Sequence, residues 1–318
     1  MVQNRSIMEG KTAKSRGFAM RRGSFVILAL VVCLFVTPAL APAQEAALKK
    51  PWFDSAGVPI HYIVTGKADG EPVVLIHGFT GSIERQWPRV IDALKKDYKV
   101  IAMDCRGHGS SGKPHDPKKY GIEMVNDVAR LLDHLKIDKA HLAGYSMGAS
   151  LALAFTVHHP ERVRSLTMGG HGVPDPNRSK LLGELAESLD MGKGIGPLII
   201  ALAPQNKPSP TPEQIKLIDT AVLAVNDAKA LACVIRSFNG NKDMLLSDKQ
   251  IQEIRVPTAA FIGADDPLRP GVDQFKKLLP KTRVVVIDGA DHITAFMRPE
   301  FVNGVHQFLN ENRQPPKE

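Results

Sequence analysis

The chain has 318 residues, of which 43% are hydrophobic and 23% are charged, and its formal net charge is +8 at pH 7. This length and composition predict a large globular core in one or two domains and exclude an intrinsically disordered chain. Without residues 1–43, which carry six Lys or Arg and one Glu, the net charge falls to +3. The remainder has no basic stripe and no interleaved aromatic patch, so we exclude a nucleic-acid-binding protein.

The N-terminal segment is organised like a secretory signal peptide. Two arginines precede an apolar run, Phe25 to Val36, and small residues follow it. We expect cleavage between Ala43 and Gln44, and a secreted or periplasmic protein that keeps no membrane span. The alternative is an uncleaved anchor, but the uninterrupted run is about a dozen residues, whereas a spanning helix needs roughly 20. The sequence leaves open whether translation starts at Met1 or Met20.

Beyond the signal segment, β-rich runs alternate with helical patterns, which predicts a mostly parallel, doubly wound α/β sheet. The chain begins with an expected hairpin that turns at Ala56-Gly57. The elements expected after it are strand 73–76, helix 86–96, strand 99–103, helix 122–135, strand 141–143, helix 149–159 and strand 163–168. Only Cys105 and Cys233 follow the signal segment, too few for a disulfide framework.

Residues 175–249 interrupt this alternation. They have helical patterns with a proline-rich break at Pro204 to Pro210, and we interpret them as an inserted helical cap. The alternation resumes with strand 257–262, helix 272–279, strand 283–287 and helix 299–309. We therefore expect a core that is split into residues 44–174 and 250–318 around the cap.

The sequence Gly144-Tyr145-Ser146-Met147-Gly148 is a G-x-S-x-G motif between a predicted strand and a predicted helix. In this context the serine occupies a strained turn that exposes its hydroxyl above the sheet. A serine hydroxyl is a weak nucleophile unless a base takes its proton. We predict that Ser146 is the nucleophile, and Tyr145 is a possible pocket residue.

An oxyanion formed by attack of Ser146 on a carbonyl needs N–H donors that are already in place. The backbone of Met147 is expected to supply one of them. His77-Gly78-Phe79-Thr80-Gly81 follows a predicted strand directly, and we expect the N–H of Phe79 to be the second donor. His77 itself is interpreted as a buried, hydrogen-bonded loop residue and not as an acid–base group.

The general base is predicted to be His292, which lies just beyond the last predicted strand. A carboxylate must hold its tautomer and stabilise the imidazolium. Asp265 and Asp266, in Gly263-Ala264-Asp265-Asp266-Pro267, compete for this role. His171 follows strand 163–168 and is a second possible pocket residue.

With Ser, Asp and His in this chain order, the sequence resembles the α/β-hydrolase superfamily from about residue 50 to 311. In that family the acid commonly lies three residues after the glycine of a strand-end G-x-x-D, so the resemblance favours Asp266 over Asp265. The segment Asp104 to Ser111 resembles the family's D-x-R-G-x-G-x-S turn, in which we interpret Asp104 and Arg106 as braces for loops near the site. Family members that are dehalogenases or epoxide hydrolases have Asp where Ser146 stands.

These features together predict a serine hydrolase that cleaves a carboxylic ester or related carbonyl through an acyl-enzyme. No metal or cofactor motif is present in the sequence, so neither is expected. The cap has nine Lys or Arg against eight Asp or Glu between Arg178 and Lys249, and Phe238 is its one aromatic residue. This balance suggests a small, apolar, uncharged substrate. The resemblance leaves open a lactonase, a carbon–carbon bond hydrolase, a cofactor-free haloperoxidase, a lyase, or a non-catalytic ligand-binding homologue.

Overall fold

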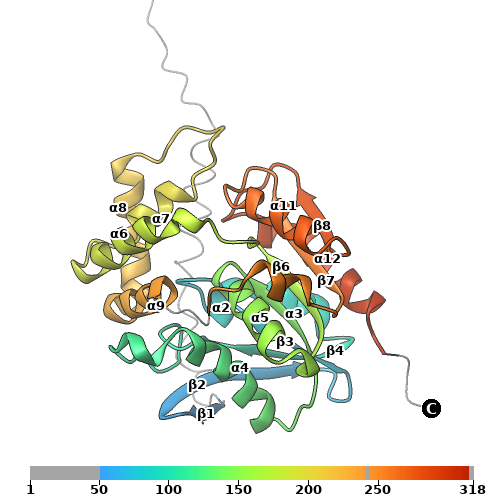
Figure 1. Ribbon diagram of the computed structural model, residues 1–318. Helices are drawn as coiled ribbons and strands as arrows, with labels where there is room; N and C mark the ends of the chain where they lie inside the picture. Colours follow the sequence, from blue (N-terminus) through green and yellow to red (C-terminus); the bar gives the residue numbers. More distant parts are fainter. Residues whose placement is uncertain (1–50, 241–243, 315–318) are drawn as a thin grey trace, which may run out of the picture.

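The computed structural model describes residues 51–240 and 244–314, so the predicted signal peptide lies outside the described residues. The described chain forms an eight-stranded sheet in the order β1-β2-β4-β3-β5-β6-β7-β8, with helices on both faces (Figure 1). β2 pairs antiparallel with β1 and β4, and the other pairs are parallel. The predicted mostly parallel α/β sheet is confirmed. Its strands are β1 (Trp52–Ser55), β2 (Val58–Gly66), β3 (Glu71–Ile76), β4 (Tyr98–Met103), β5 (Ala140–Tyr145), β6 (Val163–Gly169), β7 (Thr258–Gly263) and β8 (Arg283–Ile287).

The hairpin of β1 and β2 turns at Ala56 and Gly57, where it was predicted. Their φ angles are 53° and 80°, the left-handed values that a two-residue hairpin turn of the I′ type requires. Ala56 is a non-glycine residue in this region, so the turn is held by the flanking strands and by the hydrogen bond that the Gly57 N–H donates to Asp54 Oδ2 at 3.1 Å.

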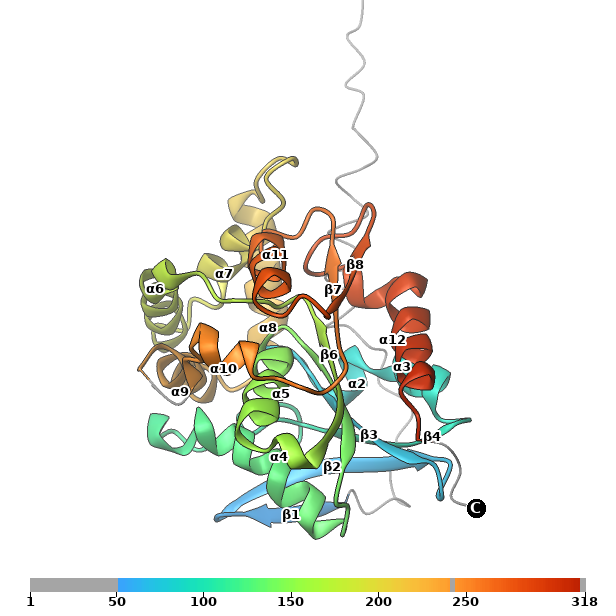
Figure 2. The same ribbon diagram turned by 45° about the vertical axis from the view of Figure 1, so that its right-hand side comes forward.

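The central strands are buried on both faces, and alternate residues contribute to two separate cores. In β3, Val74 and Ile76 pack with α4 (Ile122–His134), α5 (Met147–His158) and α11 (Arg269–Leu278). Val73 and Leu75 pack on the opposite face with α3 (Pro88–Leu94) and α12 (Pro299–Glu311). Figure 2 shows these two helical layers on either side of the sheet. Such burial on both faces explains the continuous apolar runs of the parallel strands.

The helix expected at 86–96 is two helices, α2 (Ile83–Gln86) and α3, with Trp87 between them. Ser82 caps α2 by accepting a hydrogen bond from the N–H of Arg85, and Pro88 begins α3. The apolar period of α3 was visible in the sequence. The short α2 was missed because it is a single capped turn with no period of its own.

The described elements between β6 and β7 include η3 (Pro176–Arg178), α6 (Ser179–Asp190), α7 (Gly196–Ala201), α8 (Pro212–Val225), α9 (Ala228–Gly240) and α10 (Asp248–Gln252). Helices α6 to α9 stand together beside the sheet (Figure 1) and share a small core of their own. Phe79 packs against this core and against the main core. Ile251 of α10 packs in the main core instead. Within the described ranges, no helix is both long and apolar enough to cross a bilayer.

Candidate active site

The turn between β5 and α5 holds Ser146 in a strained conformation, with φ 52° and ψ −115°. Its N–H donates to the carbonyl of Gly169 on the neighbouring strand at 2.8 Å. Close backbone approach dictates the two glycines of the motif. A Cβ on Gly144 would lie 2.2 Å from the carbonyl oxygen of Gly148, and a Cβ on Gly148 would lie 2.0 Å from that of Ile76. Glycine at position 144 therefore lets the start of α5 pack against β5, and glycine at position 148 lets it pack against β3.

Three side chains from distant parts of the chain form one hydrogen-bonded series. Ser146 Oγ lies 3.0 Å from His292 Nε2, and His292 Nδ1 lies 2.9 Å from Asp266 Oδ2. Asp266 and His292 are buried, whereas Ser146 is half-buried. The carboxylate fixes the tautomer with the proton on Nδ1, which leaves Nε2 free to accept a proton from the serine.

Asp265 and Asp266 are placed differently; position in the chain left them in competition, and the resemblance to the family favoured Asp266. The second carboxylate oxygen of Asp266 accepts the N–H of Leu268 at 2.9 Å, which keeps its partner oxygen directed at His292. Asp265 accepts a hydrogen bond from Asn206 Nδ2 at 2.8 Å. The geometry puts Asp266 next to the imidazole and turns Asp265 toward the loop between α7 and α8.

Tyr145 is buried against His292 and does not line an open pocket, contrary to the expectation that it is a pocket residue. Its hydroxyl donates to the backbone carbonyl of His292 at 2.7 Å, and its ring centroid is 5.6 Å from the imidazole and 5.2 Å from Phe296. The side chain is 3% exposed. Tyr145 therefore supports the loop that carries the imidazole. Sequence reasoning missed this contact because the two residues are far apart in the chain.

The loop after β3 approaches Ser146 closely, since a Cβ on Gly78 would lie 3.4 Å from Ser146 Cβ. Gln86 Oε1 accepts the N–H of Gly78 at 2.7 Å and so holds the loop. Among the described residues, neither the Phe79 N–H nor the Met147 N–H donates to another group. Two backbone donors beside the serine are thus left available. No pattern in the sequence indicated that Gln86 would hold this loop.

His77 has the character of a structural loop residue. Its Nε2 accepts the N–H of Cys105 at 3.0 Å, so Nδ1 carries the proton and donates to the Gly78 carbonyl at 2.7 Å. Burial lowers the pKa of His77, with the charge of Asp104 opposing the shift. A neutral imidazole with both nitrogens engaged has no capacity for proton transfer to a substrate.

His171 lies close to the hydrogen-bonded series. It follows Gly170, where a Cβ would be 3.1 Å from His292 Cε1. Burial, together with the smaller effects of the charges of Arg178 and His292, lowers the pKa of His171 to about 3. His171 is therefore neutral near pH 7 and adds no positive charge beside His292.

The turn after β4 is held by two buried charged residues. Asp104 accepts hydrogen bonds from His61 Nδ1 and from the N–H groups of Ile83 and Ser110, each at 2.8 Å. Arg106 is fully buried and forms a bidentate ion pair with Asp127. These contacts fasten the loops that surround the site to α2 and α4.

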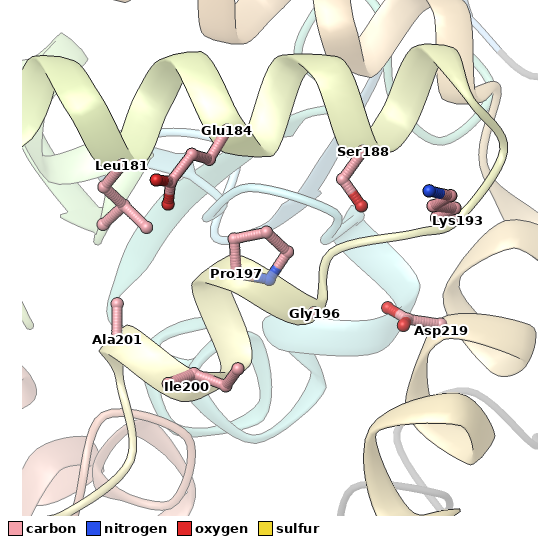
Figure 3. A pocket seen from close by; sticks show the side chains of 9 residues that line it. All are labelled: Leu181, Glu184, Ser188, Lys193, Gly196, Pro197, Ile200, Ala201 and Asp219. Atoms are coloured by element: carbon pink, nitrogen blue, oxygen red, sulfur yellow. The ribbon is translucent and has the colours of Figure 1, made fainter. Parts of the chain in front are cut away.

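An open hollow of about 520 Å³ lies between α6, α7 and α8, outside the hydrogen-bonded series. Figure 3 shows Glu184 and Ser188 of α6 facing Pro197 and Ile200 of α7 across it, with Asp219 of α8 at one end. Over the residues that the structure describes, no three His, Cys, Asp or Glu side chains are grouped as metal ligands.

The family model for the alpha/beta hydrolase fold matches residues 71–192. A protein of Bacillus subtilis (strain 168), provisionally named a 2-succinyl-6-hydroxy-2,4-cyclohexadiene-1-carboxylate synthase, is 30% identical over 272 residues, which are 80% of this chain and 96% of that protein. The 2-hydroxy-6-oxo-6-(2'-aminophenyl)hexa-2,4-dienoic acid hydrolase of Metapseudomonas resinovorans is 27% identical, over 85% of this chain and 94% of that protein. The chain therefore belongs to the alpha/beta hydrolase fold family and is a hydrolase.

Solved structures agree with this fold. The enol-lactonase from Burkholderia xenovorans LB400 superposes with a TM-score of 0.68 at 21% identity, over 82% of this chain and 100% of that chain. A carboxylesterase structure from Nitrososphaera gargenis superposes with a TM-score of 0.66 at 20% identity, over 82% and 98% of the two chains. At these identities the similarity supports the architecture, and the activity has to be argued from the site.

Proposed function

We propose that this hydrolase cleaves a carboxylic ester or a related carbonyl compound through an acyl-enzyme on Ser146. The observation that carries the proposal is the series Ser146, His292 and Asp266, joined by contacts of 3.0 Å and 2.9 Å at the end of a strained turn. Such a series activates a serine, because the imidazole takes the hydroxyl proton and the carboxylate stabilises the resulting cation.

In this mechanism Ser146 Oγ attacks the substrate carbonyl while His292 Nε2 accepts the hydroxyl proton. The N–H groups of Phe79 and Met147 stabilise the oxyanion, and one such donor contributes about 3–4 kcal/mol in comparable sites. Collapse of the tetrahedral intermediate expels the alcohol, which takes the proton from His292. Water then attacks the acyl-enzyme with His292 as the base, and the acid product leaves Ser146 regenerated.

A carbon–carbon bond hydrolase is the second candidate. Relatives named as hydrolases of oxo-dienoic acids support it, since the Metapseudomonas resinovorans enzyme aligns over most of both chains. In such a reaction the leaving group is a carbanion equivalent and not an alkoxide. Assays with a 2-hydroxy-6-oxo-dienoate and with simple esters separate the two candidates by their relative kcat/KM.

The decisive test is chemical labelling of Ser146. The purified protein is treated with a fluorophosphonate probe and assayed with p-nitrophenyl esters of increasing acyl length, with Ser146→Ala as the matched control. We expect the wild type to be labelled and to turn over short or medium esters, and the variant to do neither. Absence of both labelling and turnover in the wild type would favour a ligand-binding homologue.

We further propose that the chain is exported and that residues 1–43 are removed, on the basis of the charged and apolar pattern of this segment. The measurement is N-terminal sequencing of protein recovered from the extracellular or periplasmic fraction. Gln44 is the expected first residue. An intact N-terminus in the membrane fraction would contradict cleavage.

A further inference from the structure

A loop of the cap contacts both segments that carry the proposed acid and base. It connects α7 to α8 and lies at the top of the views in Figure 1 and Figure 2. We propose that Lys207 latches this loop to the segments of Asp266 and His292, and that the latch positions the cap over Ser146 and determines how tightly substrate is held. Lys207 is thus a positioning residue, and the inference rests on the proposed hydrolase function.

The ammonium group of Lys207 bridges two carboxylates. Its Nζ lies 3.4 Å from Asp265 Oδ2 and 3.4 Å from Asp291 Oδ2. The preceding Asn206 adds a hydrogen bond to the other oxygen of Asp265 at 2.8 Å. Asp265 precedes Asp266 in the chain, and Asp291 precedes His292. The loop therefore contacts the residues that immediately precede Asp266 and His292.

Asp291 provides a rigid anchor for the latch. Its Oδ1 accepts the N–H groups of Ile293 and Thr294 at 3.2 and 3.0 Å, and the hydroxyl of Thr294 at 2.7 Å. The Asp291 side chain is only 6% exposed. Because one oxygen is fixed by the turn of its own loop, the other is held toward Lys207 without further loss of side-chain freedom.

The two anchoring segments behave as one unit, since the N–H of Asp265 donates to the carbonyl of Ala290 at 2.9 Å. Over the residues that the structure describes, Lys207 is the sole cation within ion-pair distance of either Asp265 or Asp291. Loss of its charge leaves two carboxylates without a counter-ion at the edge of the site. Among the described residues, the hydrogen bond from Asn206 to Asp265 then remains as the polar contact between this loop and the two segments.

The composition of the loop suits a latch. Pro204, Pro208 and Pro210 fix their φ angles, which reduces the number of conformations the loop visits when it is released. Asn206 is exposed, and the Lys207 side chain is 32% exposed. A stiff loop needs few contacts to stay docked, so two partly exposed interactions are sufficient to bias it toward the closed position.

The contacts predict an effect on substrate binding more than on chemistry. The bond between Asp266 and His292 is held by Leu268 and by the carbonyl contact of Tyr145, neither of which involves Lys207. Removal of Lys207 therefore leaves the hydrogen-bonded series in place. Without Lys207 the cap loop opens more often, and this raises KM for esters that are large enough to reach the cap.

The test is Lys207→Met, which removes the charge and keeps an unbranched side chain of nearly the same length. Hydrogen–deuterium exchange of peptides covering residues 198–212 is expected to quicken, and KM for a medium-chain p-nitrophenyl ester to rise about fivefold, with kcat within about twofold of wild type. Lys207→Arg is expected to restore both readouts. Lys216→Met, at an exposed position of α8, is the matched control and is expected to change neither.

The outcomes separate this inference from the proposed function. If the wild type is not labelled by a fluorophosphonate, the hydrolase mechanism fails, while the exchange measurement still tests the latch. If Lys207→Met leaves exchange and KM unchanged, the latch is wrong. A loss of kcat for all esters with KM unchanged would also overturn the proposal, because Lys207 would then act on the chemistry of the series.

Discussion

Asp265 and Asp266 are consecutive in the chain, yet their carboxylates have different partners. Asp266 Oδ2 lies 2.9 Å from His292 Nδ1, whereas Asp265 Oδ1 accepts from Asn206 of the cap loop at 2.8 Å. The turn that begins at Gly263 separates them, because the N–H of Asp266 bonds back to the carbonyl of Gly263 at 3.2 Å while that of Asp265 bonds to Ala290. One acid therefore belongs to the proposed chemistry and the other to the cap.

Separate replacements test this division. Asp266→Asn is expected to lower kcat by about 10⁴-fold, because the amide disfavours the correct imidazole tautomer and does not stabilise the cation. Asp265→Asn is expected to keep kcat within about fivefold, since it loses only a half-exposed ion pair. The measurement is kcat and KM for one p-nitrophenyl ester in both variants. A loss of kcat in Asp265→Asn but not in Asp266→Asn would reverse the assignment.

Tyr145→Phe tests whether the phenol supports the segment of His292. The substitution removes the 2.7 Å hydrogen bond and leaves a buried carbonyl without its donor. We expect the free energy of unfolding to fall by about 1–3 kcal/mol. We also expect kcat to fall more than KM changes, because the imidazole is held less firmly. Denaturant unfolding and ester kinetics provide the two readouts, and an unchanged variant in both would contradict a supporting role.

Asp104 is expected to make the protein sensitive to acid. Burial raises its pKa, but the hydrogen bond from His61, the electrostatic interaction with the nearby His77 and two backbone N–H groups outweigh burial and lower it from 3.8 to about 2. A carboxyl with a depressed folded-state pKa stabilises the fold above its unfolded pKa, and this stability is lost as pH falls through the folded value. Between about pH 5 and about pH 2 this loss amounts to about 2 kcal/mol.

The measurement is denaturant unfolding across that pH range in the wild type and in Asp104→Asn. The variant is expected to be less stable near neutral pH and to lose about 2 kcal/mol less on acidification. Asp69→Asn, at an exposed position, is the control and is expected to follow the wild type. Equal acid slopes in Asp104→Asn and the wild type would show that Asp104 does not carry this dependence.

The features that could be read from the sequence are those carried by local pattern. The strand that ends at Tyr145 is a run of buried residues, and α5 follows at once, so the turn of Ser146 was visible between two strong signals. The hairpin at Ala56 and Gly57 was visible for the same reason. A run and its flanking turn lie within one stretch of chain, where periodicity and turn chemistry determine the structure.

Contacts between distant segments could not be read in the same way. The bond from Tyr145 to His292 joins residues 147 positions apart, and Gln86 reaches Gly78 only because α2 turns back on the loop after β3. The different directions of Asp265 and Asp266 depend on the backbone bonds of one turn. No pattern in the sequence indicated the ion pairs of Lys207, because a lysine in a proline-rich loop ordinarily has a solvated side chain.

The need for glycine in the turn at Ser146 can be tested by replacing Gly148 and, as a comparison, Gly183. In Gly148→Ala the new Cβ would lie 2.0 Å from the carbonyl oxygen of Ile76, so α5 must move away from β3. We expect the free energy of unfolding to fall by about 2–3 kcal/mol. We also expect labelling by a fluorophosphonate to slow strongly, because this displacement shifts Ser146 from His292.

Gly183→Ala is the matched change in α6, where a Cβ would meet nothing within 4 Å. Alanine is the better helix former, so the free energy of unfolding is expected to rise by about 0.5–1 kcal/mol, with labelling unchanged. Thermal or denaturant unfolding of the two variants beside the wild type measures both effects. If both substitutions changed stability in the same direction and by the same amount, the close approach of β3 to α5 would not be what demands glycine at position 148.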